Sequence, residues 1–128
     1  MPEPGAAAEA GWEPLSEDVR RTLEILLDGE AGEAGYRAQI PHTRMKAGCT
    51  CGCPSQYLLV GPGGVPAACA EPGAAPIVAS RCLRSPDGGY VGEALLFADE
   101  GLMVSLEVCH WEDLGPLVPP LWQRLDPV

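Results

Sequence analysis

Positive charge is scarce in this sequence. The 128 residues include eight basic side chains, of which Lys46 is the only lysine, against 18 acidic ones, so the formal net charge at pH 7 is −10. No stretch gathers three or more basic residues, and a surface that neutralises several phosphates at once is not expected. This argues against binding to nucleic acid and to anionic membranes. A basic partner is compatible with the charge but not specifically indicated, because net negative charge chiefly favours solubility.

Long apolar runs are also missing. No window approaches the roughly 18 apolar residues that a membrane span needs. Residues 1–13 carry three glutamates and lack the basic start and apolar stretch of a signal peptide. We therefore expect a cytoplasmic protein, in a compartment that keeps thiols reduced.

Catalytic motifs are few. The sequence has neither a Gly-x-Gly-x-x-Gly fingerprint nor a P-loop, and residues 61–64 (Gly-Pro-Gly-Gly) have only the composition of a phosphate loop, since no lysine follows. Of the two histidines, His42 and His110, the second adjoins Cys109. On a strand these neighbours point to opposite faces and cannot form a nucleophile–base pair with each other. A hydrolase or a nucleotide-dependent enzyme is not supported, and a non-enzymatic protein is favoured.

The length and composition predict one folded domain with long loops. A chain of this size is typical of a single domain, and it carries 16 glycines and 14 prolines. Residues 1–13 are expected to form a flexible leader and residues 14–128 a single α+β domain. Within that domain, residues 114–128 are rich in proline and predict an extended wrap, with Leu117, Leu121 and Trp122 as anchors.

An N-terminal helix is the clearest local signal. Ser16 is a good N-cap and is followed by two acidic residues, which the helix dipole favours. An apolar stripe then recurs with helical spacing at Val19, Leu23, Leu26 and Leu27, and a glycine at position 29 ends the helix. Residues 31–39 predict a short second helix, weakened by two glycines.

Strands follow. Extended segments are expected at 42–47, 55–60, 77–84, 90–97 and 102–111, with turns at 85–89 and 98–101. In the last strand, strict alternation predicts one face with Leu102, Val104, Leu106 and Val108, and another with Met103, Ser105, Glu107 and Cys109. Together these patterns predict a helix or helix pair packed on an antiparallel sheet of four to five strands.

The chemically distinctive feature is the run Cys49-Thr50-Cys51-Gly52-Cys53-Pro54. In a fully extended chain its thiols would share one face about 7 Å apart, which is too far for a disulfide. Gly52 permits a positive φ, and Pro54 favours an extended Cys53, so a bend that gathers the sulfurs is expected here.

Three interpretations of this bend remain open. In the first, it is a structural corner and free cysteines act as small hydrophobes, as Cys82 and Cys109 would within their strands; no cofactor is then expected. In the second, the thiolates hold a soft metal, zinc or copper(I), with candidate ligands Cys49, Cys51, Cys53, Cys109 and His110; Cys69, Cys82 and His42 are further sources of a fourth ligand. In the third, Cys51 and Cys53 form a labile disulfide that acts as a redox switch.

Three segments of the sequence together resemble a known group of proteins. They are Arg37-Ala38-Gln39-Ile40, Cys49-Thr50-Cys51-Gly52-Cys53-Pro54-Ser55, and Leu95-Leu96-Phe97 with Gly101-Leu102 and Leu106-Glu107-Val108. Over roughly residues 19–110 the chain resembles small proteins of high-GC Gram-positive bacteria, a family to which no activity is assigned. The cysteines at 69, 82 and 109 lie outside the shared pattern, so a six-cysteine site is not implied by it.

The sequence as a whole predicts a non-enzymatic binding or accessory module. Its partner, a protein or a small molecule, is not identified by any motif, and either a monomer or a homodimer is compatible with its size. The thiol-ligated metal site and the thiol–disulfide switch are the alternatives.

Overall fold

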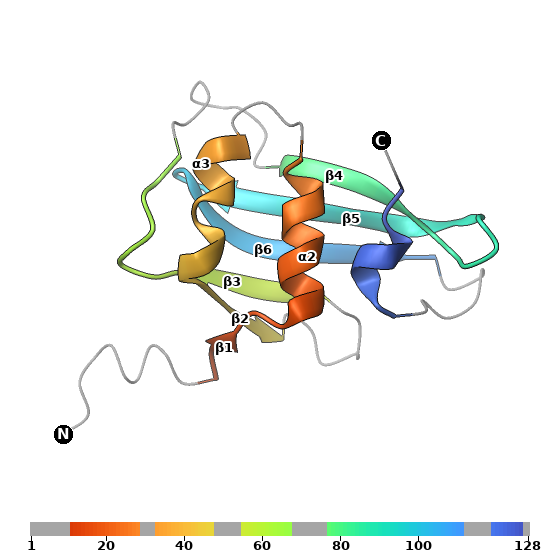
Figure 1. Ribbon diagram of the computed structural model, residues 1–128, viewed down its shortest axis with the longest axis horizontal. Coiled ribbons are helices and arrows are strands. Elements are labelled where there is room, and N and C mark those ends of the chain that lie inside the picture. Colours follow the sequence, from red (N-terminus) through yellow and green to blue (C-terminus); the bar gives the residue numbers. More distant parts are fainter. Residues whose placement is uncertain (1–10, 29–32, 48–54, 68–76, 112–118, 127–128) are drawn as a thin grey trace.

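The computed structural model describes residues 11–28, 33–47, 55–67, 77–111 and 119–126. In these residues one antiparallel sheet has the strand order β1-β2-β3-β6-β5-β4, and the helices lie together on one of its faces (Figure 1). The predicted α+β architecture is confirmed. No helix in this part of the chain is long and apolar enough to cross a membrane.

Helix α2 (Glu17–Leu26) follows the sequence signals closely. The Ser16 hydroxyl oxygen accepts the N–H of Val19 at 3.1 Å, and two acidic residues occupy the first turn. The predicted apolar stripe is buried against the sheet, with Leu23, Leu26 and Leu27 fully enclosed. A short helix α3 (Glu33–Arg37) and a 3-10 turn η1 (Ile40–His42) lead from α2 into the sheet.

Six strands make the sheet, one more than the upper expected number. They are β1 (Glu13–Pro14), β2 (Thr43–Ala47), β3 (Gln56–Val60), β4 (Ile77–Arg84), β5 (Tyr90–Asp99) and β6 (Leu102–His110). The additional strand, β1, has two residues and pairs with Met45 and Arg44 of β2. Two residues are too few to show a period-2 pattern, so this edge strand was not predicted.

A β-bulge in β6 changes which residues face the helices. Phe97 of β5 pairs with Ser105, whereas the next β5 residue pairs with Met103, so Val104 is an extra residue on β6. Met103 is consequently buried with Leu106 in the core, and Val104 is exposed. The predicted alternation is wrong for the start of this strand, because one inserted residue shifts the two-residue period.

The sheet face away from the helices has no helix of the described chain over it. We call it the open face. It carries alternate side chains of the five long strands, namely Arg44, Lys46, Tyr57, Leu59, Ile77, Ser80, Cys82, Glu93, Leu95, Phe97, Val104, Ser105, Glu107 and Cys109.

The described part of the C-terminal segment packs on both α2 and β4. The 3-10 helix η3 (Leu121–Arg124) begins where the Asp18 carboxylate accepts the N–H groups of Leu121 and Trp122, at 2.9 and 3.0 Å. Leu125 then forms a β-bridge with Leu83. The predicted anchor Leu121 is buried and Trp122 half-buried, while Leu117 lies outside the described residues.

Candidate functional site

The predicted cysteine site cannot be placed in full. Cys49, Cys51 and Cys53 lie outside the described residues, as does Cys69. Cys82 and Cys109 are free thiols on the open face, one half-buried and the other exposed. Both lie within strands as expected, and Cys109 is exposed because no described helix covers that side of β6.

Cys109 and His110 lie on opposite faces of β6, as adjacent strand residues must. Cys109 pairs across the sheet with Glu93 on the open face, whereas His110 pairs with Gly92. The Nε2 atom of His110 is buried and has no hydrogen-bond partner in the described part of the chain. Within 11–28, 33–47, 55–67, 77–111 and 119–126, no three His, Cys, Asp or Glu side chains are grouped as a metal site.

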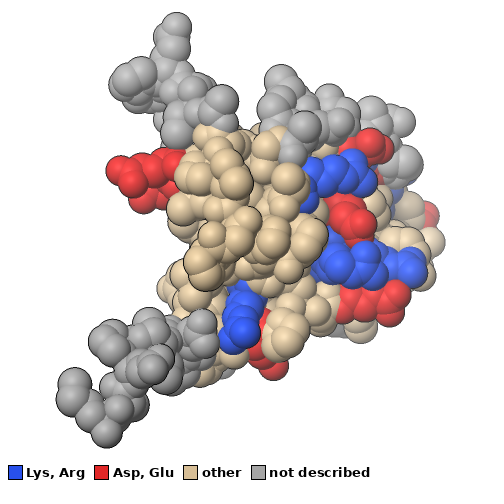
Figure 2. All heavy atoms as spheres, turned by 60° about the vertical axis from the view of Figure 1, so that its left-hand side comes forward, with Lys and Arg blue, Asp and Glu red and all other residues tan. Residues whose placement is uncertain are grey.

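A hollow of about 320 Å³ opens at one end of strands β1, β2 and β3. We call it the end pocket. Figure 2 brings this end of the molecule forward and shows a largely uncharged surface with charged side chains at its margins. The pocket is lined by Pro14, Pro41, His42, Thr43, Arg44, Leu59, Gly61, Pro62 and Gly63.

A tight turn at residues 61–64 builds one wall around His42. The Gly61 N–H donates to the His42 carbonyl oxygen at 2.7 Å, and the Gly64 N–H donates to the Gly61 carbonyl at 2.9 Å. Pro62 follows Gly61 and presets the φ that such a turn needs. A Cβ on Gly63 would lie 2.6 Å from Nδ1 of His42. Only glycine therefore allows the turn to pack this closely against the imidazole.

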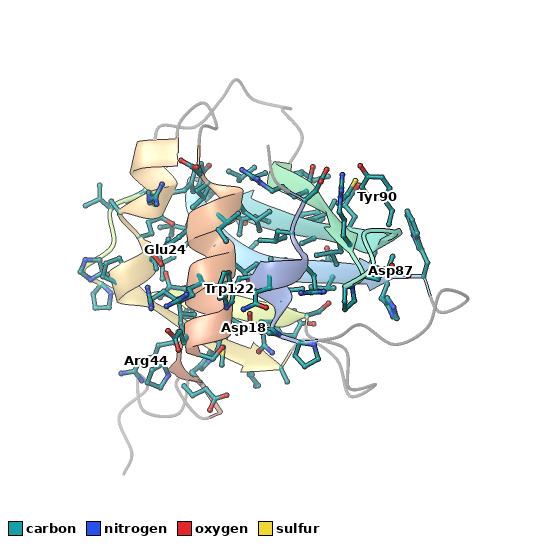
Figure 3. All side chains as sticks on the ribbon, turned by 45° about the vertical axis from the view of Figure 1, so that its right-hand side comes forward. Asp18, Glu24, Arg44, Asp87, Tyr90 and Trp122 are labelled. Carbon is teal, nitrogen blue, oxygen red and sulfur yellow. The ribbon has the colours of Figure 1, made fainter. Side chains whose placement is uncertain are left out.

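Charge in the end pocket is of one sign. Arg44 enters from β2, where it pairs in register with Pro14 on one side and Leu59 on the other, and it lies beside β1 in Figure 3. No carboxylate is among the lining residues, although the chain carries a net charge of −10. Thr43 supplies the hydroxyl in the lining, and it donates to the Gln39 carbonyl at 2.7 Å.

A second, shallower hollow of about 370 Å³ lies between α2 and η3. Its charges are paired within the protein. The Arg21 guanidinium stacks over the Trp122 ring at 4.8 Å, and Arg20 bridges Glu24 at 2.6 Å. The end pocket is the more enclosed of the two hollows, and it is the better candidate site for that reason.

Only one wall of the end pocket, the turn at residues 61–64, has a signal in the sequence. Residues 61–64 stood out by composition, but no nearby lysine completed a known motif. The missing charge comes from β2, and it is the pairing of Thr43 with Val60 that brings His42 opposite Gly61. Comparisons of the chain with family models, with curated proteins and with solved structures found no match.

Proposed function

We propose that this protein is a non-enzymatic binding module whose site is the end pocket and whose ligand is a small organic anion. The observation that carries the proposal is that Arg44 and His42 both line a hollow of about 320 Å³ whose lining includes no carboxylate. In a chain with a net charge of −10, such a hollow is a local exception to the prevailing negative charge.

The lining residues match the two parts of an organic anion. The guanidinium of Arg44 offers a planar set of N–H donors suited to a carboxylate or a phosphate, and the imidazole of His42 can add another. Leu59 and the three prolines offer apolar contact to the remainder of the ligand. The volume is at the lower end of the range for small-molecule sites, which favours a small molecule.

Binding is a better match to these groups than catalysis. The Thr43 hydroxyl donates a hydrogen bond to the Gln39 backbone carbonyl oxygen, so its proton is directed into the protein and not toward a base in the pocket. Arginine stays protonated in proteins and so cannot act as a base. The pocket groups can hold an anion and orient it.

Titration followed by amide NMR tests the proposal. Sodium phosphate, acetate and benzoate are added separately at constant ionic strength, with sodium chloride as the control. We expect saturable shifts confined to residues 41–44 and 59–64, and at least tenfold weaker binding in Arg44→Gln. The matched variant Arg37→Gln, an exposed arginine on α3, should bind as the unmodified protein does. Equal binding by Arg44→Gln, or shifts centred on Arg20 and Arg21, would overturn the proposal.

A glycine substitution tests the geometry of the pocket independently of its charge. Gly63→Ala should displace the His42 imidazole, because the new Cβ would lie 2.6 Å from Nδ1, and should weaken anion binding without unfolding the protein. Gly89→Ala is the matched control, since a Cβ there meets its nearest atoms at 3.6 Å. Unchanged affinity in a folded Gly63→Ala protein contradicts a role for this turn.

A second candidate function is a thiol-ligated metal site, and His110 favours it. Its Nε2 is buried without a hydrogen-bond partner in the described residues, and imidazole nitrogen is a common zinc ligand. The Val108 N–H, two residues before His110, donates to Ser55 Oγ at 2.8 Å. Ser55 is the first described residue after the segment that holds Cys49, Cys51 and Cys53.

Metal analysis of untagged protein decides this second candidate. Stoichiometric zinc or copper that is lost in Cys51→Ser/Cys53→Ser and in His110→Gln, but retained in Cys82→Ser, would support it. Metal-free protein, or metal retained in the double variant, would exclude it. Counting reactive thiols before and after mild oxidation tests the redox switch, which six reactive thiols in both states would rule out.

A further inference from the structure

The open face combines exposed apolar side chains in one continuous band. Four of them are strongly exposed for large apolar residues: Tyr57 at 52%, Ile77 at 43%, and Leu59 and Val104 at 37% each. Phe97 and Leu95 are half-buried between them. Contiguous apolar surface of this kind marks an interaction site more often than isolated exposed residues do.

The strand register shows that the band is continuous. Ile77 pairs with Phe97, Phe97 with Ser105, Ser105 with Tyr57, and Tyr57 with Lys46. This single row crosses five neighbouring strands, each about 4.8 Å from the next. Residues on adjacent rows extend the band on either side, so the apolar residues form one surface.

Charged side chains on the same face are separated by sign. The basic pair Arg44 and Lys46 lies on β2, and the acidic pair Glu93 and Glu107 lies on β5 and β6. Lys46 and Glu107 are two strands and two residues apart, or about 12 Å between Cα atoms. The Lys46 ammonium lies over the Trp12 ring, 5.9 Å from its centroid, rather than on Glu107. These four charges sum to zero, and Asp99 at the end of β5 adds one exposed carboxylate to the face. The face is therefore much closer to neutral than the whole chain, which carries −10.

We infer that the open face binds the open face of a second copy of this chain. In a two-fold arrangement the same patch is used by both copies. The apolar band of one copy then packs on the apolar band of the other, and Lys46 of each copy approaches Glu107 of its partner. A face whose own charges are complementary by sign suits a self-association that a uniformly acidic surface would oppose. Arg44 and Leu59 belong both to this face and to the lining of the end pocket, whereas Tyr57, Lys46 and Glu107 do not line the pocket. The inference does not rest on anion binding there.

The size of the face agrees with a modest, reversible dimer. Five strands at about 4.8 Å spacing and about seven residues long cover about 550 Å² per copy, or about 1,100 Å² for the pair. Specific interfaces begin near about 1,000 Å² of total buried area and commonly reach about 1,600 Å². The expected dimer is therefore at the weak end of the range and sensitive to single substitutions.

Sedimentation velocity from 1 to about 500 µM, with circular dichroism as the folding check, measures the association. We expect a concentration-dependent dimer that Tyr57→Glu weakens at least tenfold. Val65→Glu is the matched control, because Val65 is also exposed but lies outside the sheet. A folded protein that remains monomeric throughout this range overturns the inference and leaves the face to a different partner.

A charge exchange tests the pairing itself. Lys46→Glu and Glu107→Lys should each weaken the homodimer at least tenfold, because each places like charges opposite one another in both copies. Mixing the two variants restores opposite charges at both positions, so a heterodimer as strong as the original is expected. Unchanged homodimers, or a mixture no stronger than either variant alone, would refute the arrangement.

Discussion

Gln39 is completely buried, and its side-chain amide joins three separate parts of the chain. Nε2 donates to the carbonyl oxygens of Gly101 at 2.7 Å and Val65 at 3.1 Å, while Oε1 accepts the N–H of Met103 at 3.1 Å. The β5–β6 turn and the segment before Ala67 are thereby fixed to η1. A buried amide with its donors and its acceptor used is a source of stability rather than a cost.

Replacement of Gln39 should therefore destabilise the fold. Gln39→Ala leaves the buried N–H of Met103 without a partner and opens a cavity, so we expect the free energy of unfolding to fall by roughly 3 kcal/mol. Urea denaturation measures this. Gln123→Ala, an exposed glutamine on η3, should change it by less than about 0.5 kcal/mol. Equal effects of the two substitutions would contradict the assigned role.

Residue-scale features divide into those that sequence can predict and those that it cannot. Ser16 could be assigned as a cap because its signal is local: a small polar residue before a helical apolar stripe. The role of Gln39 could not, because its partners lie 26 to 64 positions away. The end pocket could not be predicted for the same reason. Its residues Arg44 and His42 line one hollow with Gly63 only because β2 pairs with β3.

At the scale of elements, the β4–β5 hairpin shows how a short turn is held. Its turn closes through the Ser85 N–H, which donates to the Gly89 carbonyl at 2.8 Å, and Gly88 adopts a φ of 96°. The pKa of Asp87 is held below its ordinary value, chiefly because the Ser85 hydroxyl donates to its carboxylate and further because the Gly89 N–H does so at 3.2 Å. Asp87 and Tyr90 lie at this end of the sheet in Figure 3.

The acid response of this hairpin follows from that shift. Because the folded-state pKa of Asp87 is lower than the unfolded one, its charge stabilises the turn above the unfolded pKa, near 3.9. This stabilisation is lost as the pH falls through the folded-state pKa. Ser85→Ala should raise the pKa of Asp87 toward its ordinary value in a carboxyl-carbon NMR titration. Ser80→Ala, on the preceding strand β4, should leave it unchanged. An unchanged pKa of Asp87 in Ser85→Ala would contradict the mechanism.

Strands could be predicted as elements, but their irregularities could not. The segments 77–84 and 102–111 carry enough β-branched and alternating residues to be recognised, and both are strands in the structure. The bulge at Val104 depends on how β6 matches β5, which no single strand encodes. This one residue moves Met103 into the core and Val104 onto the open face.

At the scale of the whole molecule, one carboxylate connects the first helix with the last. Asp18 lies in the first turn of α2 and accepts two backbone N–H groups from η3, more than 100 residues later in the chain. Asp18 and Trp122 lie together at this junction in Figure 3. The Arg84 guanidinium also pairs with Asp126 at 2.7 Å. The C-terminal segment is thus fixed at both of its described ends.

Removal of the Asp18 carboxylate should loosen this segment selectively. Asp18→Ala is expected to lower the free energy of unfolding by about 2 kcal/mol and to speed hydrogen exchange at the amides of Leu121 and Trp122. Glu17→Ala, its exposed neighbour in the same turn, should leave that exchange unchanged. If both variants exchange alike at these two amides, the contact does not hold η3.

The strand order also determines how far apart in the chain the sheet's partners lie. β4, β5 and β6 follow one another along the chain, as do β2 and β3, and each group can pair through short connections. The two groups meet through the pairs Gln56–Leu106 and Tyr57–Ser105, about 50 residues apart. Closing so long a loop costs conformational entropy before any contact repays it. We therefore expect formation of the β3–β6 junction to limit the folding rate, and chains in which it has not yet formed would expose two unpaired strand edges to their neighbours.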